Sequence, residues 1–547
     1  MRKKLVNLDN LDQAKDTDKI KNVKQLQNHL LRRVASVKPS YWQRKMRPSR
    51  TAAAALAVDT RIDTSMDILT AADDSPPDRR LRARRQQRLP VRIGGMGIAD
   101  NVGTRGAMWT NSVLSTWDAI RDIAPFLSHI DAATSDLPFF SELRAVYANL
   151  RQRHHRVAAR YITLDATEYH DFDGTIKTSF HPKDLTPAAR LPENITLFFA
   201  ETKTESRIKP PSQKGLSSIV MHENWVTLLD ECVAADAQRL AMGERILHRE
   251  ATRFISGSQA YAAVINNVLP VSRRLESDKL LVTTQRNYGL YLSAATPLLN
   301  AISGAGETVT EDDRLGDGFA HDADHSTAHK WTAIAWKDAE ANASSDATVY
   351  MGDKKKGKEH YSQFCSSYVP DVVTIHEDGV DLAEIKNYSP FVHAATTKPA
   401  VTTLNGHTHG FGNTEERLKH RVLGSRRRGT RSDGKYDHRN GTGHVPAHDG
   451  DYVDAIKNRK AKVHLLVHET TGGISPFAAR RLRRLARAAA ENDNDTTDYT
   501  LSSTARAFVP YYSQRICTAI RMHGAQGILQ RISRARRDRL RVPQARA

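Results

Sequence analysis

The spacing of the hydrophobic residues changes at about residue 300, and this change constrains the fold more than any other feature of the sequence. Before that point apolar residues recur at helical intervals, and runs that alternate between apolar and polar residues are nearly absent. After it, the segment YVPDVVTIHEDGVDLAEIKNY has the pattern of two strands joined by a turn at Glu377 to Gly379, and KVHLLVHET has the pattern of a third. We therefore predict a mainly α N-terminal half and an α/β C-terminal domain.

The same patterns divide the chain into segments. Helical spacing in the N-terminal half occurs over residues 23–31, 51–69, 107–123, 138–161, 225–254 and 258–268. A charged, proline-bearing segment over residues 201–215 is typical of a linker. Two further helices are expected at residues 329–343 and 476–490, and Pro476 suits a first helical position. The predicted domains are residues 1–90, 91–324 and 325–500, followed by a C-terminal helix and basic tail over residues 501–547.

Charge favours a polyanionic partner. The chain has 547 residues, with 81 Lys and Arg against 62 Asp and Glu, and its formal net charge is +19. Lys and Arg displace counterions from a phosphate backbone, which suits binding to DNA or RNA. The three cysteines are far apart and form no CxxC pair, so no disulfide framework is predicted. No uncharged stretch approaches the roughly 20 residues of a membrane span. We expect an intracellular protein with no membrane partner, and its charge suits the nucleus.

The predicted hairpin places three residues together that could carry chemistry. A turn at Glu377 to Gly379 brings Asp371 on the first strand beside Glu384 on the second, and Glu384 shares a face with Lys386 because side chains alternate along a strand. Two carboxylates can bind Mg²⁺ or Mn²⁺, which lowers the pKa of a bound water, while an ammonium group orients the nucleophile. This is the set of groups that metal-dependent hydrolysis of a phosphodiester requires.

The Pro-Asp of Asp371 and the Glu-x-Lys of Glu384 and Lys386 resemble the motif of the PD-(D/E)xK nuclease superfamily. The resemblance covers about residues 325–500 and implies a restriction-endonuclease-like fold, a small mixed sheet flanked by helices. It also implies that Asp371 and Glu384 are metal ligands and that Lys386 is the catalytic lysine. The alternative interpretation is a solvated hairpin whose charged side chains pair on the surface.

Other acidic residues are weaker candidates for metal ligands. Those in or near the turn favour turns for local reasons, the one that ends the third strand could cap it, and those on the preceding helix suit a solvated face. They are Glu377, Asp378, Asp381, Glu469, Asp338 and Glu340.

Two arginine clusters are candidates for contact with nucleic acid. Arg426, Arg427 and Arg428 lie in a long loop over residues 405–449, which we interpret as a basic flap over a nucleic-acid groove. The second cluster lies in the basic tail and includes Arg534, Arg536 and Arg537. The long loop also contains six histidines, but none of them forms a His-x3-His pair on an apolar helix and none has a cysteine partner, so a metal site there is not predicted. The cationic run from Arg151 to Arg156 fits a solvated helix face better than a nucleic-acid contact.

The front of the chain carries a second resemblance. LPVRIGGMGI, at residues 89–98, resembles the LPxxxGGLGL element that follows the thumb of reverse transcriptases encoded by non-LTR-type retroelements. NHLLRRVASVKPSYWQRKMRPSRTAAAALAVDTRI and ADAQRLAMGERILHREATRFISGSQAYAAVINNVLP are similar to helical segments of the same polyproteins, in the same order. Residues 1–90 then correspond to a thumb-like remnant and residues 91–324 to a connector.

The chain departs from that family in two respects. It has no [YF]xDD metal motif and no palm, so polymerase activity is not expected. The family often carries a Cys/His zinc knuckle before the nuclease, whereas this chain has His321, His325 and His329 without a cysteine, which argues against zinc binding there.

Two functions follow from the sequence. The first is a Mg²⁺-dependent or Mn²⁺-dependent DNA endonuclease derived from a retroelement polyprotein. The second is a catalytically inactive remnant of a truncated reverse transcriptase, in which the helical half and the arginine-rich tail bind RNA or DNA. Both contain the same three residues, so a cleavage assay is needed to separate them.

Overall fold

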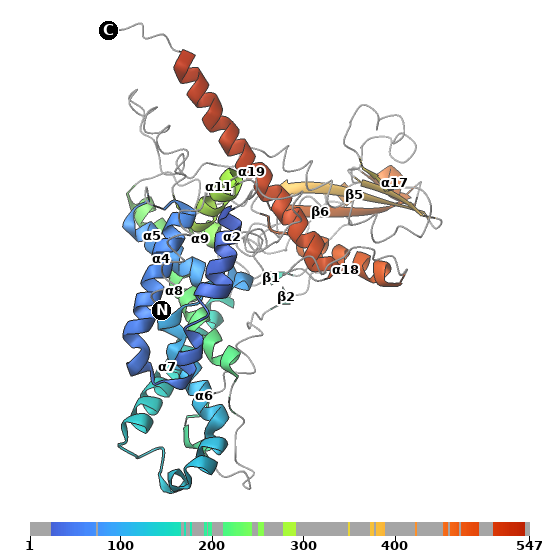
Figure 1. Cartoon of the computed structure of the whole chain (residues 1–547). Coiled ribbons are helices and arrows are strands. Elements are labelled where there is room, and N and C mark those ends of the chain that lie inside the picture. The colour runs from blue at the N-terminus through green and yellow to red at the C-terminus, as the bar shows by residue number, and fades with distance from the viewer. Residues whose placement is uncertain are drawn as a thin grey trace, which may run out of the picture.

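The computed structural model shows an elongated group of helices, a small sheet beside it, and a long helix, α19, that runs between the two (Figure 1). It describes residues 23–72, 75–165, 169–170, 176–177, 191–193, 195–199, 210, 212–242, 250–255, 277–290, 348–350, 372–376, 379–388, 422–423, 452–457, 460–469, 472–491 and 507–541.

The described residues of the helical half form mainly α-helices. The first elements are α2 (Val23–Leu30), the π-helical turn η1 (Leu31–Ala35), α3 (Ser40–Lys45), α4 (Pro48–Thr70), α5 (Pro77–Arg88) and α6 (Asn101–Ile123). They are followed by α7 (Pro138–Asp165), α8 (Gln213–Ala241), α9 (Glu250–Ile255) and α11 (Ser277–Tyr288). The 3-10 turns η2 (Val91–Ile93), η3 (Pro125–His129) and η4 (Ile195–Phe198) and a two-residue ladder of β1 (Tyr169–His170) with β2 (Ile176–Lys177) lie between them. The mainly α character predicted for this half is confirmed.

Local sequence signals set the ends of several helices. Proline occupies the first position of α4, α5 and α7, where its missing N–H would have no helical partner. Asp100 caps α6 by accepting a hydrogen bond from the backbone N–H of Gly103 at 2.8 Å, and Ser212 caps α8 by accepting one from Gly215 at 3.1 Å. These caps explain why both helices begin earlier than hydrophobic spacing predicted.

Two expectations for this half need correction. The expected linker over residues 201–215 ends at Ser212, because Gln213, Lys214 and Gly215 already belong to α8. The helix expected over residues 225–254 is two helices, α8 and α9, with residues 243–249 outside the described part. The helices expected at residues 258–268 and 329–343 lie outside the described residues.

Two hydrophobic clusters form the core of the helical half. The larger one joins α6, α7, α8 and α9, and its aromatic members include Trp109, Trp117, Phe140, Trp225 and Phe254. The rings of Trp117 and Phe140 meet edge to face, with centroids 5.8 Å apart. The smaller cluster joins α4 and α5 to Met96 and Ile98, and it also contains Tyr288 and Leu290 at the end of α11. Residues near 290 therefore pack against residues 31–98, across the predicted boundary at residue 90.

The sheet has four strands in the order β3–β4–β5–β6. They are β3 (Thr348–Tyr350), β4 (Val372–His376), β5 (Gly379–Tyr388) and β6 (Lys462–Glu469). β4 pairs with β5 in an antiparallel ladder from Val372 opposite Ala383 to His376 opposite Gly379, which confirms the predicted hairpin. β6 pairs with β5 in parallel, from Lys462 opposite Asp381 to Glu469 opposite Tyr388. The sheet is therefore mixed, and β5 lies between an antiparallel and a parallel neighbour.

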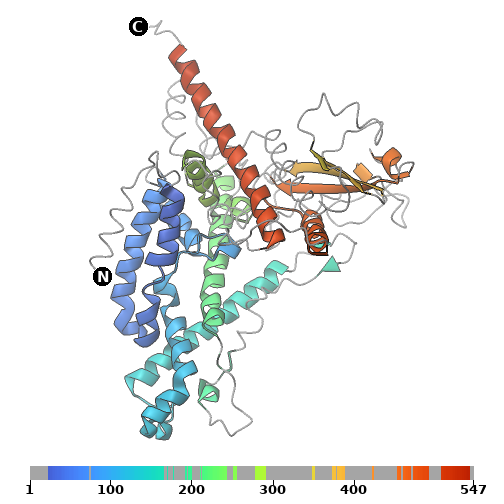
Figure 2. The ribbon, with the colours of Figure 1, turned by 45° about the vertical axis from the view of Figure 1, so that its right-hand side comes forward.

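Helices cover both faces of β5 and β6. On one face, Leu382, Leu465 and Val467 pack with Tyr452 and with Ala455 of α17 (Val453–Lys457). On the other face, Ala383, Ile385 and Leu466 pack with α18 (Pro476–Glu491) and α19 (Phe508–Arg541). Figure 2 shows α18 beside the N-terminal end of α19, near the sheet. None of the described helices combines the length and the apolar character that crossing a membrane requires.

Candidate active site

β5 presents Glu384 and Lys386 on the face of the sheet that α17 covers. Side chains of a strand alternate between faces, so Glu384 and Lys386 share the face of Leu382, while Ala383 and Ile385 point to α18 and α19. The neighbouring strands fix β5 on both sides, because the antiparallel ladder with β4 and the parallel ladder with β6 both include Leu382 and Ala383. The two charged residues therefore stand on a strand held by hydrogen bonds from both directions.

Glu384 is a buried carboxylate with a partner on each oxygen. It is 5% exposed. Its Oε1 forms an ion pair with the Nζ of Lys386, and its Oε2 accepts a hydrogen bond of 2.5 Å from the hydroxyl of Tyr452. A buried charge needs such partners because it has lost its hydration. The Lys386 side chain is 36% exposed, so its ammonium group connects this buried carboxylate to the surface.

Tyr452 is the member of this group that sequence reasoning missed. It is fully buried, lies 68 residues after Glu384 in the chain and directly precedes α17. Its backbone N–H donates to the carbonyl of Val422 at 3.2 Å, which ties the stretch before α17 to a second distant segment. No local pattern in the sequence links a tyrosine at this position to β5, because the contact depends on how α17 packs on the sheet.

The remaining predicted site residues are only partly within the described structure. Asp371 lies outside the described residues, while the next residue, Val372, pairs with Ala383. Arg426, Arg427 and Arg428 also lie outside the described residues, as do the alternative acids Glu377, Asp378, Asp338 and Glu340, and His321, His325 and His329. Glu469 is the last residue of β6, as predicted. Arg534, Arg536 and Arg537 lie within α19.

Asp381 has a structural position on the opposite face of the sheet. Its Oδ2 lies 2.8 Å from a terminal guanidinium nitrogen of Arg481 on α18 and 3.2 Å from the Nε2 of His464 on β6. Asp381 and His464 are both buried, and burial lowers the pKa of His464 although its contact with Asp381 acts the other way. Asp381 thus ties α18 to the sheet, and its position argues against a shared metal site with Glu384.

The oxygen atoms around Glu384 can be compared with the ligands that a divalent metal ion requires. Mg²⁺ and Mn²⁺ prefer oxygen ligands, usually one or two carboxylates completed by water and substrate phosphate. Glu384 supplies one carboxylate, whose two oxygens contact the Lys386 ammonium group and the Tyr452 hydroxyl. Within the described part of the chain, no three His, Cys, Asp or Glu side chains gather as metal ligands would. The fit therefore depends on Asp371 as the second carboxylate.

Aspartates on α4 form salt bridges with arginines on α5 in the helical half. Asp59, Asp63 and Asp67 recur every four residues along α4, and Arg84 and Arg88 have the same spacing on α5. Arg84 pairs with Asp67, whereas Arg88 pairs with Asp63 at 2.5 Å and with Asp59 at 3.2 Å. The repeated spacing was a usable signal in the sequence, because side chains four residues apart lie on one helical face.

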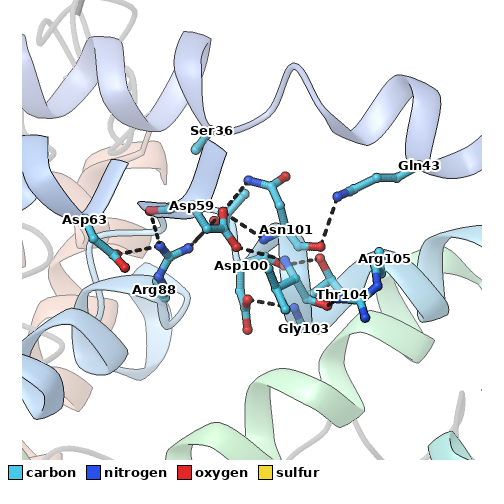
Figure 3. A network of polar contacts seen from close by, with 12 residues as sticks. Ser36, Gln43, Asp59, Asp63, Arg88, Asp100, Asn101, Gly103, Thr104 and Arg105 are labelled. Atoms are coloured by element: carbon cyan, nitrogen blue, oxygen red, sulfur yellow. Dashed lines mark hydrogen bonds and ion pairs between the residues drawn. The ribbon is translucent and has the colours of Figure 1, made fainter. Parts of the chain in front are cut away.

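The same network also fixes the start of α6 (Figure 3). Asp59 accepts hydrogen bonds from the side-chain amide of Asn101 at 2.8 Å and from the backbone N–H of Val102 at 2.8 Å. The side chain of Gln43 donates to the carbonyl of Asn101 at 3.0 Å, and this brings α3 to the same point. These hydrogen bonds satisfy backbone groups at the start of α6, which is a structural role.

Arginines of the helical half mostly meet acids of the same chain. In the cationic run of α7, Arg153 and Arg156 both pair with Glu223 on α8, and Arg160 pairs with Asp230. In α5, Arg85 pairs with Glu231 and Arg79 with Glu250. These pairs hold the helices together and leave less positive charge for a nucleic acid than the sequence suggests, which favours the solvated or structural interpretation of the α7 run.

Comparison with known proteins adds no family to this picture. The sequence matches no protein-family model, and no curated protein matches it. The geometry of the residues on β5 therefore carries the functional interpretation.

Proposed function

We propose that this protein is a metal-dependent DNA endonuclease of the PD-(D/E)xK type that hydrolyses phosphodiester bonds at Asp371, Glu384 and Lys386. The observation that carries the proposal is the contact between Lys386 and Glu384 on one face of a strand with an antiparallel and a parallel neighbour. The mixed sheet with helices on both faces agrees with the expected fold. Because Val372 pairs with Ala383, the ladder supports a position for Asp371 beside Glu384.

The proposed mechanism assigns one task to each side chain. Glu384 and Asp371 would hold Mg²⁺ or Mn²⁺, which when bound would lower the pKa of water and offset negative charge at the reacting phosphate. Lys386 orients the attacking water and balances charge near Glu384. Tyr452 donates to Glu384 Oε2 and so fixes the rotamer of the carboxylate, in the way that outer hydrogen bonds orient metal ligands.

A nicking assay on supercoiled plasmid tests the proposal. Wild-type protein with Mg²⁺ should nick the plasmid, and EDTA should abolish the reaction. Glu384→Gln and Asp371→Asn should each lower the rate by at least about 100-fold, the scale on which positioned catalytic groups act. Lys386→Ala should lower the rate comparably while DNA affinity stays close to wild type. Glu193→Gln is the matched control, since its side chain is 87% exposed in the helical half.

Each outcome of this assay has a clear meaning. Loss of nicking in the three site variants with retention in Glu193→Gln supports the proposal. Nicking that survives both Glu384→Gln and Asp371→Asn contradicts it. If Lys386→Ala loses DNA affinity together with cleavage, Lys386 is a phosphate anchor and its catalytic assignment is wrong.

One observation favours the alternative, a catalytically inactive protein that binds DNA or RNA. Both carboxylate oxygens of Glu384 have partners within the protein, Lys386 and Tyr452, so the residue has a stable structural arrangement of its own. In this case the protein binds nucleic acid in a salt-dependent way and Mg²⁺ adds no cleavage. Nicking by the wild-type protein with Mg²⁺ separates the two functions, and where nicking occurs Tyr452→Phe should lower its rate, because the Tyr452 hydroxyl donates to the Glu384 carboxylate.

The origin of the protein belongs to the same proposal. The order of segments similar to a retroelement polyprotein, ending in the nuclease-like region, supports derivation from such an element with DNA as the partner and the nucleus as its location. The helical half then corresponds to thumb-like and connector regions, as divided at residues 90 and 324.

A further inference from the structure

The helix α18 has one apolar face and one basic face, and the packing of the domain buries the apolar face and exposes the basic one. Ala478, Leu482, Leu485 and Ala489 are buried, and they belong to the cluster that contains Ala383, Ile385 and residues of α19. At 3.6 residues per turn the opposite face consists of Arg480, Arg483, Arg484, Arg487 and Glu491. Arg483, Arg484 and Arg487 are exposed, and Arg480 is half-buried.

The arginines of this helix have different tasks. Arg481 lies at the flank of the helix and pairs with Asp381 on β5, so it belongs to the internal contact between α18 and the sheet. Arg484 lies near His464 and acts to lower the pKa of that histidine. In the described part of the chain, Arg483 and Arg487 form no salt bridge. This differs from α5 and α7, whose arginines mostly pair with acids of neighbouring helices.

We propose that the exposed arginine face of α18, centred on Arg483 and Arg487, docks on the phosphate backbone of duplex DNA. Charge complementarity carries the proposal, because α18 has five arginines and no acid before its last residue, Glu491. Arg483 and Arg487 are one helical turn apart, and each DNA strand carries a charge about every 3.4 Å, so two neighbouring phosphates are within their reach. The guanidinium group suits phosphate because it donates two parallel hydrogen bonds.

The packing of α18 argues against a membrane as the occupant. A basic amphipathic helix that lies on a membrane inserts its apolar face into the lipid interface. In α18 that face is already buried against the sheet and α19, with Leu482 and Leu485 at most 5% exposed. Only the charged side is open, which suits an electrostatic contact with a polyanion. The choice of DNA among the polyanions rests on the proposed function.

The test measures DNA binding by full-length protein in EDTA, so that cleavage plays no part. The affinity for a short duplex is measured between about 50 and 200 mM salt for wild type and for a variant with Arg483→Gln and Arg487→Gln. The slope of the logarithm of affinity against the logarithm of salt should become shallower by about 0.9 per lost contact. A variant with Arg483→Lys and Arg487→Lys should keep most of the slope, since the charge remains. The matched control is Arg44→Gln with Arg50→Gln, which removes two exposed arginines elsewhere.

A measurement on the wild-type protein complements the variants and does not depend on how they fold. Arginine-specific labelling with phenylglyoxal, read by mass spectrometry, should show that duplex DNA protects Arg483 and Arg487 but not Arg44 and Arg50. The proposal is overturned if the slope and the labelling are unchanged, or if wild-type protein binds no duplex. It is also overturned if the Arg483 and Arg487 variants lose binding to anionic phosphatidylserine vesicles while binding DNA normally.

The two proposals fail in different ways. Protein that binds DNA through α18 but does not nick plasmid with Mg²⁺ keeps this inference and removes the proposed endonuclease. Protein that nicks plasmid while the Arg483 and Arg487 variants bind DNA as tightly as wild type keeps the endonuclease and removes this inference.

Discussion

At the scale of single residues, Glu250 at the start of α9 is a buried charge with an arginine on each side. Its carboxylate is 2% exposed and lies between two arginines, with Arg79 at 3.0 Å and Arg253 at 2.7 Å. Burial raises the pKa of this carboxyl, but the ion pairs with Arg253 and Arg79 outweigh it and lower the pKa to about 2. The arginines in turn donate to the carbonyl groups of Gly289 and Asn287, so the ion pairs also anchor the end of α11.

The low pKa of Glu250 predicts a pH-dependent contribution to stability. The folded pKa is below the ordinary value of 4.5, so the contribution is present above pH 4.5 and is lost as the pH falls toward 2. Glu250→Gln should therefore lower the free energy of unfolding by about 3 kcal/mol at pH 7, and the difference from wild type should shrink between pH 4.5 and 2. Urea titrations of both proteins at several pH values measure this difference in the free energy of unfolding.

Two other groups bear on that experiment. Burial raises the pKa of the nearby Asp236 to about 6, although it accepts hydrogen bonds from the backbone N–H groups of Ala251 and Glu250. Its folded pKa is above the ordinary value, so its effect on stability has the opposite sign. The charge of Glu250 contributes to raising the pKa of Asp236, so Glu250→Gln should also reduce that shift. Glu193→Gln, an exposed change, serves as the control. A difference that stays constant down to pH 2 contradicts the assignment for Glu250.

At the scale of elements, the turn after α5 explains the glycines of LPVRIGGMGI. Gly94 has a φ of 97° and Gly97 a φ of 72°, a region that favours glycine. The chain then folds back on the end of α5, where the N–H of Met96 donates to Gln87 at 3.0 Å and that of Gly97 to Leu89 at 2.9 Å. A Cβ on Gly95 would lie 1.9 Å from the carbonyl oxygen of Leu89. The glycines are therefore required by backbone geometry.

This close approach predicts opposite effects for two alanine substitutions. Gly95→Ala should destabilise the protein by at least about 2 kcal/mol, because the atoms in the way are backbone atoms of Gln86 and of Leu89, at the end of α5, which have little room to move. Gly524→Ala in α19 is the matched control. Its Cβ would meet only Arg286, at 3.7 Å, and it should stabilise the helix by about 0.5 to 1 kcal/mol. Thermal unfolding of the two variants measures the contrast, and equal melting temperatures would show that the turn can adapt.

At the scale of the whole molecule, α19 connects the helical half to the sheet. Phe508, Tyr512, Ile516 and Ile520 belong to the cluster that covers one face of β5 and β6. Farther along the same helix, α19 packs against α11, as Figure 1 shows. Cys517 adds a local tie, since its thiol donates to the carbonyl of Gly472 at 2.7 Å and burial raises its pKa to about 12. One helix thus contributes to both parts of the protein.

Two truncations of α19 should therefore behave differently. A chain that ends at residue 530 keeps Phe508 to Ile528 and should unfold at close to the wild-type temperature, while the loss of Arg534, Arg536 and Arg537 should weaken DNA binding and flatten its salt dependence. A chain that ends at residue 507 loses the side chains that cover the sheet and should lose its cooperative unfolding transition. Thermal unfolding followed by circular dichroism measures the stability of each truncated chain, and salt titration measures its DNA binding. If the chain that ends at residue 530 binds DNA as the wild-type protein does, the basic end of α19 has no part in DNA binding.

The sequence by itself determined the features that depend on local periodicity. The helices of the N-terminal half, the hairpin of β4 and β5, and the common face of Glu384 and Lys386 follow from spacings of 3.6 and 2 residues, which the backbone imposes. The tertiary structure decided the rest. It placed Tyr452 against Glu384, paired the arginines of α5 and α7 with acids on other helices, and left the arginine face of α18 open. Such contacts join residues far apart in the chain, and they depend on how packed elements meet, which no local spacing specifies.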